Sequence, residues 1–310
     1  MKSSLLVTGS IAFDRIAVFK DRFSNHILKG HAHNLNVSFT VEDMEVFHGG
    51  TGGNIACNLA LLGEKPILLG SIGHDSLEYM RTLEKKKVNI SYVRRCPELL
   101  TANATIMTDL DDNQITSFYM GAMKMAHQAK IKDIKDAVSM AIIAPNNVRA
   151  MSDYADYCFK NGIPFIADPG QAIPAFSDTG LKDFITGAHM LVVNDYEWQM
   201  IADRTKWTQK EVLEKVNYLI ITYGDQGSKI WSSIDATVIE VPACKPEKMA
   251  DPTGCGDAYR AGLMYGCQHD YDIEKSARIG AWLAARCIEA KGTQNHKVSK
   301  TDFKKFLKTL

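Results

Sequence analysis

The sequence predicts an α/β protein with a mostly parallel sheet whose two faces are covered by helices. From about residue 130 onward, short apolar runs alternate with longer helical patterns, which is the order of strands and crossover helices in such a sheet. Glycine-rich segments follow several apolar runs, where proteins of this class bind ligands. The 310 residues are enough for a large core, so we expect one large domain over residues 1–310 with a small additional sheet.

Charge and cysteine content restrict the expected partners and compartment. Lys plus Arg and Asp plus Glu each number 36, so no net charge attracts nucleic acid or an anionic membrane, and a small-molecule partner is favoured. The seven cysteines form no CxxC pair, which argues against a disulfide framework or a zinc site and favours a reducing, cytoplasmic location. The apolar run at 5–13 is interrupted by Thr8 and Gly9, so we expect a strand rather than a signal peptide. No apolar run reaches the roughly 18 residues of a membrane span.

The first half of the chain is predicted to contribute to two sheets. Buried-type strands of the main sheet are expected at 5–10 and 66–72, and helices at 55–62, closed by Gly63, and at 77–88. Alternating apolar and polar residues indicate strands with one solvated face at 35–39, 44–47 and 104–120, the last turning at 109–113. We expect these strands to form a small lid over the mouth of the main domain, at about 14–48 and 100–122.

The second half is predicted to contain the regular alternation of the α/β class. Strands are expected at 140–144, 164–167, 190–193 and 218–222, followed by a hairpin of 228–231 with 237–241. Helices are expected at 132–137, 148–161, 195–203, 208–216, from 254 onward, at 272–290 and at the basic C-terminus.

One stretch, Asp251-Pro252-Thr253-Gly254-Cys255-Gly256-Asp257, is typical of a tight turn that opens a helix. The first N–H groups of a helix lack internal partners and lie at the positive end of its dipole, so such a turn binds anions. A carboxylate at Asp257 would repel a bound phosphate, but it is useful if a hydroxyl must be oriented and deprotonated while it attacks phosphorus. Taken alone, the turn is also typical of a structural loop in which Asp257 only complements the helix dipole.

A second glycine-rich helix opening, Gly49-Gly50-Thr51-Gly52-Gly53-Asn54, is compatible with a polyol site. Backbone N–H groups and the Asn54 amide would hold hydroxyl groups, and the Asp14 carboxylate can accept two neighbouring hydroxyl protons. The alternative is a close helix–sheet contact with Asn54 as a cap and Asp14 as an ordinary strand-end residue.

Two further segments follow buried strands. Asn194-Asp195-Tyr196-Glu197 is either a helix cap, with Glu197 reaching back three residues, or a pair of polar groups facing a hydrated Mg²⁺. Thr222-Tyr223-Gly224-Asp225-Gln226-Gly227 is either a plain turn or a place where nucleotide phosphates lie against the backbone. The sequence lacks GxxxxGK[ST], a strand-to-helix GxGxxG and HExxH, which argues against a P-loop enzyme, a Rossmann dehydrogenase and a zinc protease.

Together, the four glycine- and asparagine-containing motifs resemble, in order and approximate spacing, those of the ribokinase-like (PfkB) carbohydrate and nucleoside kinases. The resemblance spans about residues 5–295, and residues 7–14 and 251–262 look most like prokaryotic adenosine or broad-specificity nucleoside kinases. It implies a three-layer αβα fold with a β-sheet lid. Pro252, Cys255 and Gly53 replace residues that are commoner in the family, but none of these changes removes a required side chain.

The resemblance also implies a role for each matching position. Asp257 corresponds to the catalytic base, and the backbone N–H groups of the anion hole are those of Gly254, Cys255 and Gly256. The sugar hydroxyl groups would be contacted by Asp14, Gly49, Gly50 and Asn54. Mg²⁺ would be held by Asn194 and Glu197, through water, and ATP by these two residues together with Thr222, Gly224, Gly227 and Gly292. Whether a monovalent cation such as K⁺ is needed near Asp251 stays open.

The predicted function is an ATP-dependent nucleoside kinase, adenosine kinase-like, that phosphorylates the ribose 5′-hydroxyl. The alternative within the family is a sugar kinase of the ribokinase or fructokinase type. Apolar residues near the expected lid either stack on a base or form lid core: Phe13, Phe39, Phe47, Tyr119 and Met120. A non-catalytic nucleotide sensor would lose Asp257, which is present. Monomer and homodimer both remain open, because exposed lid strand edges can pair with a second chain.

Overall fold

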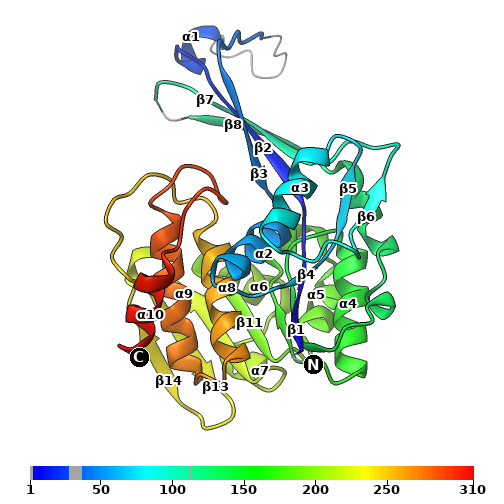
Figure 1. Cartoon of the computed structure of the whole chain (residues 1–310), viewed down its shortest axis with the longest axis vertical. Coiled ribbons are helices and arrows are strands. Elements are labelled where there is room, and N and C mark those ends of the chain that lie inside the picture. The colour runs from blue at the N-terminus through cyan, green and yellow to red at the C-terminus, as the bar shows by residue number, and fades with distance from the viewer. Residues whose placement is uncertain (1–2, 28–36, 112) are drawn as a thin grey trace.

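A computed structural model describes residues 3–27, 37–111 and 113–310, and its centre is an eight-stranded sheet (Figure 1). The strands, in spatial order, are β14 (Val238–Val241), β13 (Ser228–Ser232), β12 (Tyr218–Thr222), β11 (Met190–Asn194), β10 (Phe165–Ala167), β9 (Val138–Ile143), β1 (Ser4–Thr8) and β4 (Ile67–Leu69). The six strands from β12 to β4 run parallel, and β13 runs antiparallel to both of its neighbours, β12 and β14. The predicted α/β fold class is therefore confirmed.

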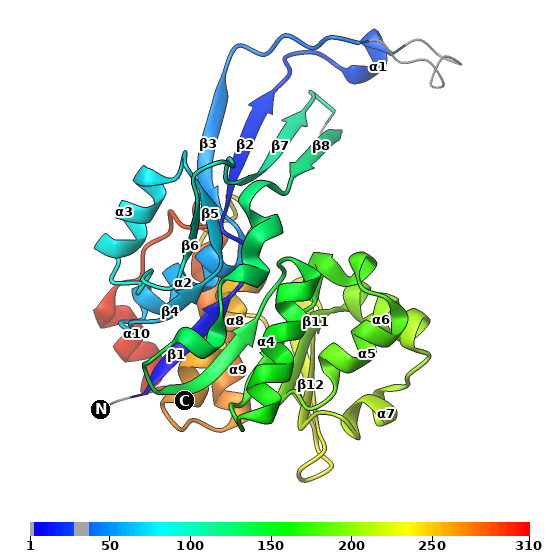
Figure 2. The same cartoon turned by 90° about the vertical axis from the view of Figure 1, so that its right-hand side faces the viewer.

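Helices cover both faces of this sheet (Figure 2) because successive strand residues point to opposite sides. In β11, for example, Val192 packs into one core cluster and Val193 into the other. The first cluster includes α2 (Thr51–Leu61), α3 (Leu77–Lys85), α8 (Cys255–Gln268), α9 (Ile273–Cys287) and α10 (Lys300–Leu307). The second includes α4 (Val148–Lys160), α5 (Asp178–Ile185), α6 (Asp195–Thr205) and α7 (Gln209–Leu213). None of the described helices is both long and apolar enough to cross a membrane.

A second, four-stranded sheet extends away from the carboxyl ends of the parallel strands (Figure 1). Its order is β3 (Met44–Gly49), β2 (Ala12–Val18), β7 (Ala102–Thr108) and β8 (Gln114–Tyr119). The predicted hairpin is β7 and β8, and the predicted strand at 44–47 is β3. A short parallel pair, β5 (Ser71–Gly73) and β6 (Arg94–Cys96), lies beside it. The small sheet exists as predicted, whereas its action as a lid is a proposal.

The strand predicted at 35–39 was wrong for residues 37–39, which lie outside any strand, and residues 35 and 36 lie outside the described residues. Phe39 instead packs against Phe19 and Phe23 at the far end of the small sheet, next to the single-turn helix α1 (Phe23–His26). The partner of β3 is β2, whose charged residues Asp14 and Arg15 hid its strand character.

Other local differences have simple physical causes. The helix predicted at 132–137 is only the 3-10 turn Ile131–Asp133, because six mostly polar residues cannot offset the cost of helix nucleation. The apolar stretch 66–72 divides at Gly70 into β4 and β5. The helical segments that were not predicted include Gly121–Gln128 and Gly170–Ala175, which are 3-10 helices, and α5, besides the single-turn helices α1 and Gly224–Gln226. In α5, the apolar spacing of Leu181, Phe184 and Ile185 was interrupted by polar neighbours.

Candidate active site

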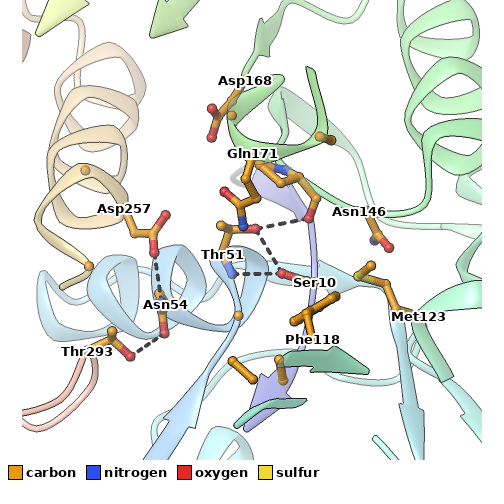
Figure 3. A pocket seen from close by; sticks show the side chains of 18 of the residues that line it. Ser10, Thr51, Asn54, Phe118, Met123, Asn146, Asp168, Gln171, Asp257 and Thr293 are labelled. Atoms are coloured by element: carbon orange, nitrogen blue, oxygen red, sulfur yellow. Dashed lines mark hydrogen bonds between the residues drawn. The ribbon is translucent and has the colours of Figure 1, made fainter. Parts of the chain in front are cut away.

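The site is a cavity of about 580 Å³ between the carboxyl ends of the parallel strands and the small sheet. Both sheets and several helix openings contribute side chains to its wall, and Figure 3 shows a selection of them. The predicted residues that line the cavity are Asp14, Gly50, Asn54, Asn194, Glu197, Gly254, Gly256 and Asp257. Segments that are far apart in the sequence therefore meet at the end of the sheet where α/β proteins bind ligands.

Two glycines allow the helices α2 and α8 to begin at this cavity. Gly50 is the N-cap of α2 with φ of 82°, and Gly254 is the N-cap of α8 with φ of 83°. A side chain is strained in this conformation, and a Cβ at Gly254 would also lie 2.9 Å from atoms of Thr293. Among the described residues, the N–H groups of Gly254 and Gly256 donate to no acceptor, while that of Cys255 donates to the Pro252 carbonyl at 3.3 Å. The opening of α8 thus has donors available for an anion.

Asn54 of α2 and Asp257 of α8 form the central contact of the site. The Asn54 Nδ2 group donates to Asp257 Oδ2 at 2.8 Å (Figure 3), although the two residues are 203 positions apart. The Asn54 Oδ1 atom accepts from Thr293 Oγ1 at 2.8 Å and from Gln294 Nε2 at 2.9 Å. Because both ends of the amide are engaged, its orientation is fixed with the N–H side toward the carboxylate.

This contact continues into a buried hydrogen-bond network. Gln294 Nε2 also donates to the hydroxyl of Tyr79 at 2.6 Å, and that hydroxyl donates to the Gly49 carbonyl at 2.7 Å. Gly49 does not line the cavity; its Cα packs against the Asp14 carboxylate, where a larger residue would clash. The network therefore connects the first glycine turn to the carboxylate of the second.

The cavity is rich in carboxylates. Burial, followed by the nearby charge of Asp251, raises the pKa of Asp14 to about 6. Burial likewise raises the pKa of Asp257 to about 6, against the opposing effects of the Asn54 hydrogen bond and of Arg260. A buried carboxyl with a raised pKa is a feature of functional sites, because a solvated carboxyl would have a pKa near 4.

Asn194 and Glu197 form a complete capping box at the start of α6. The Asn194 side chain accepts from the Glu197 N–H at 2.7 Å, and the Glu197 Oε2 atom accepts from the Asn194 N–H at 2.8 Å. The helix cap, one of the two predicted alternatives for this pair, is therefore present, and both residues also line the cavity. Within the described ranges, no cluster of three or more His, Cys, Asp or Glu is placed to hold a metal. Mg²⁺ commonly keeps several waters and takes one or two carboxylates, and this pair fits that mode of binding.

The predicted ATP residues Thr222, Gly224, Gly227 and Gly292 do not line the cavity. Thr222 pairs with Asn194 across β12 and β11, so it lies at the same end of the sheet. Gly224 is the first residue of a 3-10 turn after β12 and Gly227 follows its last residue, and both glycines have positive φ. The Gly292 N–H donates to Asp251 Oδ2 at 2.9 Å, which attaches the segment after α9 to the turn before α8.

Comparison with known proteins agrees with this geometry. Residues 3–300 match the model of the pfkB family of carbohydrate kinases. This chain belongs to the pfkB family. Among curated relatives, the nucleoside kinase of Methanocaldococcus jannaschii is 33% identical over 263 residues, which are 84% of this chain and 85% of that protein. The predicted family and the predicted class of enzyme, a phosphotransferase that acts on an alcohol group, are confirmed.

Solved structures of a nucleoside kinase and of a ribokinase share the whole fold. The nucleoside kinase of Burkholderia thailandensis in complex with inosine superposes with a TM-score of 0.89 at 35% identity and covers 99% of this chain and 98% of its own. The ribokinase of Thermotoga maritima, at 20% identity, covers 99% of both chains with a TM-score of 0.81 and supports the fold alone.

Sequence reasoning missed several residues of this pfkB-family site. Asp168 and Arg260 form a buried ion pair in the cavity wall, and Thr293 and Gln294 hold Asn54. Asp168 directly follows a predicted strand, as Asn194 does, and this signal was available. Thr293 and Gln294 lie in a segment without regular structure, so only the tertiary fold reveals their role. Of the aromatic and apolar lid candidates, Met120 lines the cavity, together with Phe118 and Met123.

Proposed function

We propose that this protein is an ATP-dependent nucleoside kinase that transfers a phosphoryl group to the ribose 5′-hydroxyl. The contact between Asn54 and Asp257 carries the proposal. It places an amide that can bind a sugar hydroxyl group beside a carboxylate that can act as a base, in one cavity. The nucleoside kinases among the relatives favour the same substrate class.

Asp257 is proposed as the base that orients the attacking hydroxyl and accepts its proton. In a loose phosphoryl-transfer transition state, positioning and charge stabilisation contribute more than base strength. The N–H groups of Gly254, Cys255 and Gly256 are proposed to stabilise the charge of the transferred group. The Cys255 N–H must leave its long bond to Pro252 for this purpose.

The sugar hydroxyl groups are proposed to bind Asp14, Gly50 and Asn54, with Gly49 allowing Asp14 to lie close to the first glycine turn. On the donor side, Asn194 and Glu197 would hold Mg²⁺ through water, and the metal would neutralise charge on the phosphates. Thr222, Gly224, Gly227 and Gly292 are proposed to contact ATP from outside the described cavity. The small sheet would close over both substrates and exclude water, which prevents hydrolysis of ATP.

The volume and the apolar lining of the cavity make the sugar-kinase alternative less favoured. Its volume of about 580 Å³ lies within the range for drug-sized ligands, and its small-sheet side carries the apolar residues Phe118, Met120 and Met123. A free pentose offers no apolar face of matching size, whereas a nucleobase does.

ADP release measured over adenosine, inosine, guanosine, cytidine, ribose and fructose tests the proposal. We expect turnover with one or more nucleosides, with the free sugars at least tenfold poorer in kcat/KM. Turnover confined to the free sugars would overturn the assignment in favour of the ribokinase or fructokinase type.

Three further expectations accompany the proposal. A monovalent cation such as K⁺ near Asp251 is testable as an activation by KCl over choline chloride. A homodimer formed through the edge strands of the small sheet, β3 and β8, is an alternative to a monomer, and sedimentation distinguishes the two.

All seven cysteines are free, in agreement with the proposed reducing, cytoplasmic location.

A further inference from the structure

A chain of buried hydrogen bonds leads from a backbone carbonyl to the proposed base. It begins at the Gly49 carbonyl at the end of β3 and passes through the Tyr79 hydroxyl in α3 to the Gln294 amide. From there it reaches the Asn54 amide and the Asp257 carboxylate. The side chains of Tyr79, Gln294 and Asn54 belong to residues that are at most 6% exposed, so these bonds are shielded from competing water.

Only one arrangement of donors and acceptors satisfies every contact in this chain. A backbone carbonyl only accepts, so the single proton of Tyr79 is used in its 2.7 Å bond to Gly49. The Tyr79 hydroxyl must then accept at 2.6 Å, and the Gln294 atom beside it must be the donor Nε2. The second N–H of Nε2 is available for Asn54 at 2.9 Å. Asn54 therefore presents its Oδ1 to Gln294 and its Nδ2 to Asp257.

Thr293 does not select this orientation by itself. Its Oγ1 lies 2.8 Å from Asn54 Oδ1 and 3.1 Å from the His48 carbonyl. Because a hydroxyl can donate or accept, Thr293 could donate to His48 and accept from a reversed Asn54 amide. Gln294 lacks this freedom, because Tyr79 already determines which of its atoms is the donor. The Gln294 side chain is therefore the group that excludes the reversed amide.

The fixed amide makes the two oxygens of the Asp257 carboxylate different. Oδ2 accepts from Asn54 at 2.8 Å, and Figure 3 shows the other oxygen, Oδ1, directed away from Asn54. Within the described part of the chain, Oδ2 is the Asp257 oxygen that accepts a hydrogen bond, and no donor reaches Oδ1. A reversed amide would place its own oxygen against Oδ2 and leave both acceptors without a donor. Oδ1 is thus the oxygen that remains free to accept a proton.

We propose that Gln294 is a positioning residue of the active site. Anchored by Tyr79, it holds the Asn54 amide so that Asp257 Oδ2 stays hydrogen-bonded and Oδ1 receives the proton of the attacking hydroxyl group. This inference rests on the proposed function. In that reaction the hydroxyl oxygen bonds to the γ-phosphorus, and its proton moves to Oδ1. The bond from the phosphorus to the ADP oxygen breaks, and its electron pair stays with ADP.

The simpler alternative is that Gln294 only fills a buried space between α2 and α3. Its Oε1 atom accepts from Cys57 Sγ at 3.1 Å, so it also contacts the buried side of α2. The two roles make different predictions, because a positioning residue loses its effect when the group that it positions is removed. Cys57→Ala is the matched control, since it changes a neighbour of Gln294 and leaves the donors of Nε2 in place.

The test is a double-mutant cycle of Gln294→Met and Asn54→Ala in the full-length enzyme, with steady-state kinetics for the nucleoside and for ATP. Gln294→Met alone should lower kcat about tenfold, as for the loss of one or two buried hydrogen bonds, and should keep the KM for ATP within about twofold. In the Asn54→Ala background, Gln294→Met should change kcat by less than about twofold. Cys57→Ala should stay within about twofold of the wild-type kcat.

An equal loss of kcat in both backgrounds would show that Gln294 acts through packing and would overturn the inference. Wild-type kcat in Gln294→Met would overturn it as well. If Gln294→Met does not fold, Tyr79→Phe, which removes a single hydroxyl group, replaces it in the cycle with Asn54→Ala. Its loss of kcat should likewise disappear in the Asn54→Ala background, and a loss that persists there would contradict the inference.

The inference and the proposed function can fail separately. An enzyme that accepts only a free sugar would refute the proposed function, and the same cycle is then measured with that sugar. If no substrate is turned over, the ¹³C carboxyl signal of Asp257, assigned with Asp257→Asn, replaces kcat in the cycle. Gln294→Met should shift this signal in the wild-type background and leave it in place in the Asn54→Ala background. A shift in both backgrounds, or in neither, would contradict the inference.

Discussion

Asp257 lies partly buried in the first turn of α8, where it lines the cavity and accepts a hydrogen bond from the Asn54 amide at 2.8 Å. Its replacement by Ala should lower kcat by about 10²–10⁴, the usual loss on removal of a general base. The KM for ATP should change much less, because Asp257 faces the acceptor. Steady-state kinetics of the two substrates check this, and near-wild-type turnover would exclude Asp257 as the base.

Cys255 lies in the proposed anion hole, but its side chain turns away from the cavity toward α9. Its Sγ donates to the Ala284 carbonyl at 3.6 Å, and Cys287 Sγ donates to the Thr253 carbonyl at 3.8 Å. When Cys255 is deprotonated, Cys287 donates its single S–H to Cys255 in place of the Thr253 carbonyl, and this hydrogen bond lowers the pKa of Cys255 despite its burial. The Cys255 thiol is therefore the more reactive member of the pair.

We expect Cys255→Ala to keep at least about half of the wild-type kcat, since only the backbone N–H is needed. Iodoacetamide should inactivate the wild type and spare Cys255→Ala, because the adduct would displace the α8 opening from α9. Cys244→Ala is the matched control and should remain sensitive. Equal inactivation of wild type and Cys255→Ala would show that another thiol is responsible.

At the scale of elements, the small sheet positions apolar side chains over the acceptor. Phe118 of β8 lines the cavity although its side chain is largely exposed, and Ile115 on the same strand is exposed without lining it. Because successive strand residues alternate in direction, the two side chains lie on opposite faces of β8.

Phe118→Ala should raise the KM for the nucleoside about tenfold, equivalent to about 1.4 kcal/mol of lost binding. Ile115→Ala should leave it within about twofold. Both variants should keep the wild-type KM for ATP. If Ile115→Ala raised the KM for the nucleoside more than Phe118→Ala did, the nucleobase would have to bind elsewhere than against this strand.

At the scale of the whole molecule, the site lowers the stability of the fold. Burial raises the pKa of Asp257 to about 6 in the folded state. As the pH rises from about 4 to about 6, ionisation of Asp257 therefore lowers the free energy of unfolding. Below the ordinary carboxyl pKa near 4, the residue is protonated in both states and the cost vanishes.

Asp257→Asn should therefore abolish most activity and yet increase the free energy of unfolding at pH 7.5 by about 1–3 kcal/mol, from about 1.4 kcal/mol for each pKa unit. The gain should be largely lost when pH falls toward 4. Urea denaturation at the two pH values measures it, and Asn can still accept the Asn54 hydrogen bond through its side-chain oxygen. Equal stability of the two proteins at pH 7.5 would contradict the proposed cost.

Most strands and helices of the main domain could be predicted because their signals are local. The burial of both faces gives β11 and β12 continuous apolar sequences, and the glycines before α2 and α8 mark helix openings. The errors fell where tertiary contacts outweigh local preference. β2 is a strand although it contains the charged residues Asp14 and Arg15. Residues 37–39 have a strand-like pattern, but Phe39 packs in an aromatic cluster instead of a strand.

The sequence by itself determined the fold class, the family and the two glycine turns, because motif spacing and strand periodicity are properties of neighbouring residues. Only the tertiary structure decided that the Asn54 amide faces Asp257, that Thr293 and Gln294 fix that amide, and that Asp168 and Glu197 meet Arg260. These contacts join α2, α6, α8 and β10 across long stretches of chain. Hydrogen bonds and charge interactions depend on distances of a few ångströms. Sheet order and helix packing determine these distances, so a local sequence pattern cannot predict them.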